Sequence, residues 1–185
     1  MKVSCIVPAY NESSHIVIFI NELSIELKKI SNDFEIIIVN DGSLDNTSEL
    51  ILDNYKDVSH ISYIEFTRNF GKEAAITAGL RQTTGNLCFI IDADFQHPFH
   101  YLHKMMNLYN DGYDMVYCYI SNRQHDSFLV KKLKYFFYKY IFSPDKIIIP
   151  PDAGDFRLLS RDVIDSINSL NENNRYMKGI YSWVG

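Results

Sequence analysis

The sequence predicts an α/β fold, with a mostly parallel sheet flanked by helices. Short apolar runs alternate along the chain with longer segments of helical periodicity. The run FEIIIV at 34–39 contains a continuous Ile/Val stretch, which is typical of a parallel strand covered on both faces. Strands that alternate with helices are joined by right-handed crossovers, which make the strand directions parallel.

The alternation runs from residue 3 to residue 119. The clearest helix is predicted at 12–29, where Ile16, Phe19 and Ile20 begin an i, i+3, i+4 series. We expect Ser43 or Asp45 to cap the next helix, and Pro98 to stand in the first turn of the last one. Strands are predicted at 3–7, 34–39, 61–66, 87–91 and 115–119, and helices at 12–29, 45–55, 72–82 and 98–109.

After residue 119 the regular alternation stops. The predicted segments are a polar loop at 121–127, a helix rich in aromatics and lysines at 128–142, a Pro-rich turn at 144–151, a short segment at 154–159, and helices at 161–170 and 175–184. Ser160 is the expected cap of the helix that begins at Arg161. Because the chain holds no internal repeat and no linker, we expect residues 1–185 to form a single domain.

The composition limits the classes of protein to consider. The 185 residues are 46% apolar and 22% charged, which excludes disorder and collagen-like repeats, and the net charge of −5 argues against nucleic-acid binding. No run approaches the ~18 apolar residues of a membrane span, and no signal-peptide pattern is present, so we expect a cytosolic chain. Cys5, Cys88 and Cys118 stand in apolar runs, which favours buried thiols over disulfides or zinc ligands.

Polar and charged residues follow four of the predicted strands. They lie at 8–12, 40–43, 67–72 and 92–98. The carboxyl ends of parallel strands meet at one edge of the sheet, and ligands of open α/β sheets bind at that edge. A solvated loop would explain any one of these segments, but the four together indicate a binding site.

The segment after the fourth strand has the pattern of a divalent-metal site. The chain has no GxGxxG and no P-loop motif, so phosphate would need another neutralising group. Asp92, Asp94 and Gln96 offer three oxygen-bearing side chains at alternate positions, which suits a hard divalent cation. A cation with few protein ligands completes its shell with substrate phosphates. The alternative is that the two aspartates only end the strand and cap the next helix.

Together these stretches resemble family 2 glycosyltransferases of the GT-A fold, a Rossmann-like nucleotide-diphospho-sugar transferase fold. The matching motifs are VPAYNE at 7–12, IVNDGSLDNT at 38–47, RNFGKEAAITAGL at 68–80, DADFQHP at 92–98 and PPDAGDFRLLSRDVID at 150–165. The last two are similar to the subgroup that moves a sugar from a nucleotide donor to a polyprenyl phosphate, such as dolichyl-phosphate mannose synthases and bactoprenol-phosphate glucosyltransferases. The resemblance covers nearly the whole chain and implies a hexosyltransferase.

The resemblance also implies roles for individual residues. The nucleotide-sugar set is Pro8, Ala9, Tyr10, Glu12, Asp41, Lys72 and Asp92, and the metal set is Asp92, Asp94 and Gln96. The catalytic set is Asp155, near the reacting carbon, with Arg123 and Arg157 facing the acceptor phosphate or the diphosphate. Lys72 either approaches a phosphate or is a solvated lysine in the first turn of a helix.

The chemistry of the reaction agrees with these roles. The leaving diphosphate must be neutralised, which Mg²⁺ or Mn²⁺ does as a Lewis acid. The transition state resembles an oxocarbenium ion, which a carboxylate such as Asp155 stabilises. A lipid phosphate is already anionic and needs arginines rather than a strong base, whereas a sugar hydroxyl would need a carboxylate base. Attack opposite the leaving group gives inversion.

A polyprenyl acceptor places the reaction at the cytoplasmic face of a membrane. The basic and aromatic segment 128–142 has the composition of a helix at an anionic membrane surface, and a core-packed helix with a solvated lysine face is the equal alternative. Family members usually continue beyond the final WVG at 183–185, so we expect a catalytic domain that is truncated at its C-terminus.

Two other functions stay open at this point. One is transfer to a saccharide hydroxyl in cell-surface polysaccharide synthesis, against which Arg123 and the stretch 150–157 speak. The other is a nucleotide-sugar-binding module without turnover. The sugar, the choice between UDP and GDP, and the oligomeric state also stay open.

Overall fold

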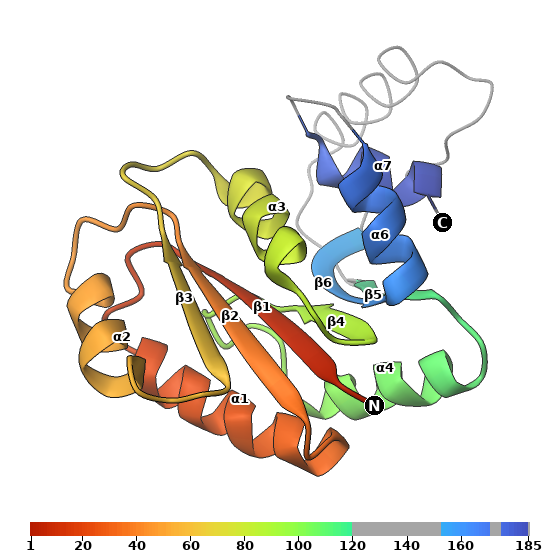
Figure 1. Cartoon of the computed structure of the whole chain (residues 1–185), viewed down its shortest axis with the longest axis horizontal. Helices are drawn as coiled ribbons and strands as arrows, with labels where there is room; N and C mark the ends of the chain where they lie inside the picture. The colour runs from red at the N-terminus through yellow and green to blue at the C-terminus, as the bar shows by residue number, and fades with distance from the viewer. Residues whose placement is uncertain (120–152, 171–174, 185) are drawn as a thin grey trace, which may run out of the picture.

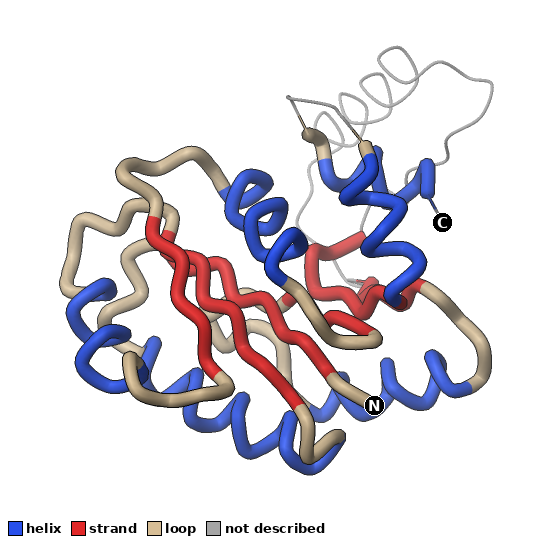
Figure 2. Tube along the Cα trace, viewed as in Figure 1, coloured by secondary structure: helices blue, strands red, loops and turns tan. Residues whose placement is uncertain are grey.

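The computed structural model describes residues 1–119, 153–170 and 175–184. These residues form a six-stranded sheet with helices on both faces (Figures 1 and 2). The strands are β1 (Val3–Ala9), β2 (Phe34–Asn40), β3 (Ile61–Glu65), β4 (Leu87–Ile90), β5 (Met115–Tyr119) and β6 (Ala153–Ser160). The helices are α1 (Ile16–Ile30), α2 (Thr47–Tyr55), α3 (Lys72–Gln82), α4 (His100–Asn110), α6 (Arg161–Ser169) and α7 (Met177–Val184).

The first four strands form the parallel sheet that the apolar runs predict. The sheet order is β3-β2-β1-β4-β6-β5, and β1 pairs in parallel with both β2 and β4. Every residue of β1 is buried, because neighbouring strands and helices on both faces enclose it. This parallel pairing, with helices on both faces, confirms the α/β prediction.

The sheet differs from the predicted one at its far edge. The segment predicted only as a short stretch at 154–159 is β6, which lies between β4 and β5 and runs antiparallel to both. Phe156 and Leu158 pack on one face of the sheet and Leu159 on the other. These apolar residues gave no sign of the strand's direction, because the apolar pattern of a strand is the same in either direction. Antiparallel pairing sets Arg157 opposite Ile90, so Asp155 lies beside the residues that follow β4.

Two apolar cores hold the helices to the sheet. One lies between the sheet and α1, α2 and α4, with Phe19, Leu27 and Phe89 among its fully buried members. The other lies under α3, α6 and α7 and contains Ile76, Ile164 and Tyr181. Figure 1 shows these two helix layers on opposite sides of the strands. Complete burial of a Leu or Ile side chain contributes about 1.5–3 kcal/mol, so the strand–helix layers are well stabilised.

Several helices begin later than predicted. Helix α1 begins at Ile16 rather than at 12, because side chains near the start of α2 bind the backbone of the preceding loop. The Glu12 N–H donates to Thr47 Oγ1 (2.8 Å), and the Ser13 N–H donates to Asp45 Oδ2 (3.1 Å). Helix α4 begins at His100 rather than at 98. These contacts come from a distant segment, which local periodicity does not report.

One of the two predictions of helix caps is confirmed, and the other is wrong. Ser160 caps α6 as predicted, since its Oγ accepts the Val163 N–H at 3.4 Å. Neither Ser43 nor Asp45 caps α2; its N-cap is Asn46, which makes no side-chain cap bond. Asp45 instead accepts the Thr47 N–H at 3.1 Å and ties the loop to the segment before α1.

The prediction of buried thiols is confirmed for Cys5 and Cys88 and only in part for Cys118. Cys5 and Cys88 are buried, Cys118 is half-buried, and all three thiols are free. Burial raises the pKa of each thiol above its ordinary value, which keeps it protonated and unreactive.

The predictions for 121–127, 128–142 and 144–151 lie outside the described residues. Among the described residues, none of the helices has the length and apolar character to cross a membrane.

Candidate active site

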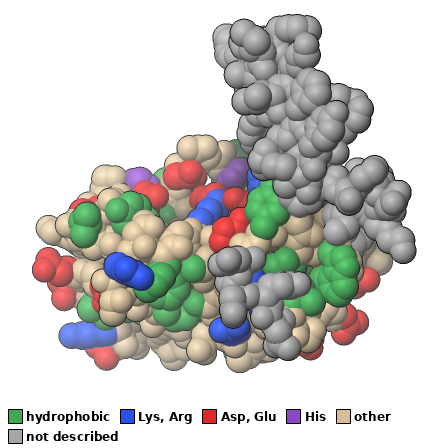
Figure 3. Space-filling view, turned by 90° about the horizontal axis from the view of Figure 1, so that it is seen from above, with side chains coloured by type: hydrophobic (Ala, Val, Ile, Leu, Met, Phe, Trp, Pro, Cys, Tyr) green, Lys and Arg blue, Asp and Glu red, His purple; other side chains and the backbone are tan. Residues whose placement is uncertain are grey.

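A cavity of about 330 Å³ opens at the carboxyl ends of the parallel strands. Its lining brings together most of the predicted nucleotide and metal residues, which are Pro8, Ala9, Tyr10, Glu12, Asp41, Lys72, Asp92 and Asp94. The last residues of β1, the loops after β1, β2 and β4, and the first turn of α3 supply them. Seen from above in Figure 3, acidic and basic side chains lie side by side near the middle of this face.

Asp41 organises the loop that enters α3. Its carboxylate is 4% exposed and accepts two backbone N–H groups, from Phe70 at 2.7 Å and from Gly71 at 2.9 Å. Gly42 has a φ of +66°, and a Cβ there would lie 2.3 Å from the backbone carbon of Arg68. The loops after β2 and β3 are therefore packed backbone against backbone. The motif alone did not reveal that Asp41 holds the loop before α3 in this position.

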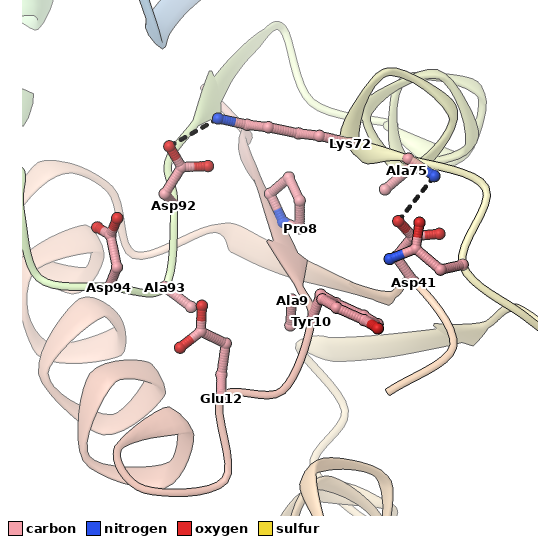
Figure 4. Close-up of a pocket in the computed structure, with 12 residues that line it drawn as sticks. Pro8, Ala9, Tyr10, Glu12, Asp41, Lys72, Ala75, Asp92, Ala93 and Asp94 are labelled. Atoms are coloured by element: carbon pink, nitrogen blue, oxygen red, sulfur yellow. Dashed lines mark hydrogen bonds and ion pairs between the residues drawn. The ribbon is translucent and has the colours of Figure 1, made fainter. Parts of the chain in front are cut away.

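Lys72 joins two carboxylates, one from the loop after β4 and one from β6. Its Nζ lies 2.7 Å from Asp92 Oδ2 and 2.9 Å from Asp155 Oδ2. Burial acts to lower the pKa of Lys72, but the two carboxylates outweigh it and raise that pKa above its ordinary value. Lys72 is thus a first-turn lysine of α3 whose ammonium is paired on both sides, while its side chain stays 38% exposed. Figure 4 shows the side chain reaching across from α3 to Asp92.

Glu12 and Asp94 lie across the cavity from the Lys72 side chain, as Figure 4 shows. Burial raises the pKa of Glu12 above its ordinary value, and the neighbouring Asp94 charge adds to the rise. Asp94 Oδ1 accepts the Gln96 N–H at 2.9 Å. The exposed Gln96 side chain is not part of the cavity lining, unlike the other two members of the predicted metal set.

The oxygen donors fit a cation that is shared with a substrate. Asp92 and Asp94 carry the hard carboxylate oxygens that Mg²⁺ and Mn²⁺ bind. The described residues hold no group of three His, Cys, Asp or Glu side chains able to enclose a metal ion. Such a site suits a cation that takes its remaining oxygens from substrate phosphates and water.

Of the three predicted catalytic residues, Asp155 contacts a residue that lines the cavity, Arg157 is buried away from the cavity lining, and Arg123 is not described. Asp155 lies at the cavity through its ion pair with Lys72. Arg157 is 3% exposed and does not line the cavity; its guanidinium carbon lies 4.9 Å from the Tyr117 ring centre and 4.1 Å from that of Tyr181. Burial lowers the pKa of Arg157, and its Nε has no hydrogen-bond partner among the residues that the structure describes. Arg123 lies outside the described residues.

One part-buried contact beside the site could not be predicted from the sequence. Glu73, the neighbour of Lys72, accepts the backbone N–H of Met177 at 2.6 Å and so ties α3 to α7. The two residues are separated by 104 positions, and no motif or spacing links them.

The profile of glycosyl transferase family 2 matches residues 4–167. The chain belongs to glycosyl transferase family 2. A match of this length spans the parallel strands, the cavity and β6, so the family 2 assignment covers the whole described site.

Two curated relatives of this family 2 chain are bactoprenol glucosyl transferases by name. It is 42% identical over 190 residues to the bactoprenol glucosyl transferase of Shigella phage SfX, covering 100% of this chain and 61% of the relative. It is 40% identical over 187 residues to the prophage bactoprenol glucosyl transferase homolog of Escherichia coli (strain K12), covering 100% of this chain and 60% of the relative. The chain thus spans about 60% of the length of these two relatives.

The fold has solved counterparts. The mannosyltransferase PcManGT from Pyrobaculum calidifontis, solved in complex with GDP-Man and Mn²⁺, matches with a TM-score of 0.60 at 20% identity, over 88% of this chain and 45% of that one. The parallel strands with the inserted antiparallel β6 are the GT-A fold, as predicted.

Proposed function

We propose that this chain is the catalytic domain of an inverting, metal-dependent glycosyltransferase that moves a sugar from a UDP- or GDP-sugar to a polyprenyl phosphate. The observation that carries the proposal is the cavity at the strand ends, where Asp92, Asp94 and Lys72 gather opposite charges around one space. The names of the bactoprenol glucosyl transferase relatives support the acceptor.

The donor half of the site binds by charge and shape. Pro8, Ala9 and Tyr10, together with Asp41, would line the base and ribose of the nucleotide. Asp92 and Asp94 would hold Mg²⁺ or Mn²⁺, which when bound neutralises the leaving diphosphate. The Mn²⁺ in the related mannosyltransferase structure supports a divalent cation here.

The acceptor half needs no strong base. A lipid phosphate carries its own negative charge, so the protein must hold it rather than deprotonate it. Asp155 lies at the cavity edge, where its charge would stabilise positive charge developing on the sugar carbon. Arg123 and Arg157 would balance the acceptor phosphate, Arg157 after a movement that uncovers its guanidinium.

The acceptor also implies a place of action. A polyprenyl tail stays in the bilayer because each exposed CH₂ costs about 0.8 kcal/mol, so the site must work at the cytoplasmic membrane face. The basic segment 128–142 would assist through its lysines. Co-sedimentation with anionic and with neutral vesicles tests this, and equal binding to both would contradict an electrostatic contribution.

The deciding experiment is turnover with a panel of UDP- and GDP-sugars, with and without polyprenyl phosphate. We expect sugar transfer only when the lipid phosphate and Mg²⁺ or Mn²⁺ are present. Transfer to an oligosaccharide but not to the lipid phosphate would favour the saccharide acceptor. Donor binding without any transfer would favour a binding module.

A further inference from the structure

We propose that Lys72 is an internal counter-cation, which pairs with Asp92 until the donor binds. When the donor diphosphate binds, Lys72 pairs with the diphosphate instead, and Asp92 becomes free to bind the divalent cation. The inference rests on the proposed function, because it assigns a step in donor binding. It makes Lys72 the residue that couples metal binding to nucleotide binding.

The geometry places one ammonium between two carboxylates. Lys72 begins α3, Asp92 follows β4, and Asp155 stands on β6, so the contact joins three separate elements. The two N–O distances are 2.7 and 2.9 Å, and without the ammonium the two carboxylates would repel each other across a shared space. The side chains are 38%, 24% and 25% exposed for Lys72, Asp92 and Asp155, so a ligand can reach all three.

The ion pair between Lys72 and Asp92 disfavours the binding of a metal ion in the absence of the nucleotide. A divalent cation at Asp92 would meet a positive charge already paired with that carboxylate, and like charges at such distances disfavour binding. Asp94 is partly engaged as well, since its Oδ1 accepts the Gln96 N–H at 2.9 Å. The described residues offer no third carboxylate, histidine or cysteine that would complete a site without substrate.

A sugar nucleotide changes the balance. Its diphosphate is a dianion that attracts the Lys72 ammonium, whose flexible four-carbon stem allows it to turn from one partner to another. Once Lys72 pairs with the diphosphate, Asp92 is free for the cation, which also binds the diphosphate. Asp155 keeps its place beside Lys72 at the edge of the cavity.

This exchange predicts two effects of opposite sign when the charge of Lys72 is removed. We expect Lys72→Met to bind Mn²⁺ alone about three- to tenfold more tightly than the wild type, because Asp92 is unpaired. We expect the same variant to bind UDP or GDP with Mn²⁺ about three- to tenfold more weakly, because the diphosphate loses its lysine. A damaged fold would weaken both, so the pair of signs separates the proposal from misfolding.

The test measures Mn²⁺ binding by electron paramagnetic resonance of the free ion, and nucleotide binding by calorimetry. Lys72→Arg retains the charge and should behave as the wild type in the Mn²⁺ measurement. Lys29→Met is the matched control, because Lys29 pairs with Glu26 on α1, away from the cavity, and should change neither value.

The outcomes separate this proposal from the proposed function. If the wild type binds nucleotide with Mn²⁺ but Lys72→Met gains no affinity for Mn²⁺ alone, the counter-cation role is wrong and the proposed function stands. A gain of equal size in Lys72→Arg would also overturn the role, since it would not depend on charge. If the wild type binds no nucleotide at all, both proposals are wrong.

Discussion

The Glu73 carboxylate holds the first residue of α7, accepting the Met177 backbone N–H at 2.6 Å. The first N–H groups of a helix have no partner within the helix, and a carboxylate beside them satisfies one and is favoured by the helix dipole. Because Glu73 follows Lys72 directly, the first turn of α3 contacts both the cavity and α7. The C-terminal helix is thus attached at the site.

This contact predicts a difference between two substitutions. Glu73→Ala should lower the free energy of unfolding by about 1–3 kcal/mol, because the Met177 N–H loses its acceptor. Glu73→Gln keeps an acceptor oxygen of similar shape and should cost much less. Urea unfolding measures both, and equal losses in the two variants would show that the hydrogen bond is not what stabilises α7.

The same residue predicts a pH dependence. Burial raises the pKa of Glu73, so the folded protein holds that proton more tightly than the unfolded chain does. The wild type therefore loses stability relative to Glu73→Gln as pH rises from about 4.3, the unfolded value, through the raised folded value. Unfolding curves across this window measure the difference, and a constant difference would contradict a raised pKa.

Asp94 should be essential for the metal and dispensable for the fold. We expect Asp94→Asn to abolish Mn²⁺-dependent donor binding in calorimetry while the unfolding midpoint stays within the error of the wild type, because Asp94 lies in a loop. Gln96→Ala is the comparison: its side chain does not line the cavity and should matter less. Unchanged metal dependence in Asp94→Asn would remove Asp94 from the metal site.

Asp41 should act on every nucleotide equally. Asp41→Ala is expected to weaken free UDP or GDP as much as the sugar nucleotide, which is a loss of uniform binding. The variant should also lose about 1–3 kcal/mol of stability for each backbone N–H left unpaired, at Phe70 and Gly71. Calorimetry and urea unfolding check the two parts, and normal binding of free nucleotide would contradict the assignment.

Gly42 offers a test of the packing between loops. Gly42→Ala adds a Cβ 2.3 Å from the Arg68 backbone as well as left-handed strain, and should cost more than ~2 kcal/mol. Gly112→Ala is the matched control, since its φ of +100° gives strain but no atom lies within 4 Å of the added Cβ. Nearly equal losses of stability in the two variants would mean that the loop beside Asp41 yields easily.

The sequence was sufficient for the parts of the site that follow parallel strands. The segments 8–12, 40–43 and 92–98 could be assembled from sequence because each follows an apolar run, and parallel strands end at one edge. The place of Asp155 could not be found in this way. Its strand runs antiparallel, and the apolar pattern of a strand is the same in either direction.

By itself the sequence determined the alternation of strands and helices, the two-sided burial of β2, and the edge at which the polar residues gather. These follow from local periodicity and from chain connectivity. Only the tertiary structure decided that Lys72 lies between Asp92 and Asp155, that Asp41 holds the loop before α3, and that Arg157 is buried between Tyr117 and Tyr181. The reason is physical: these contacts depend on strand order, register and packing, which bring together side chains that local sequence patterns do not connect.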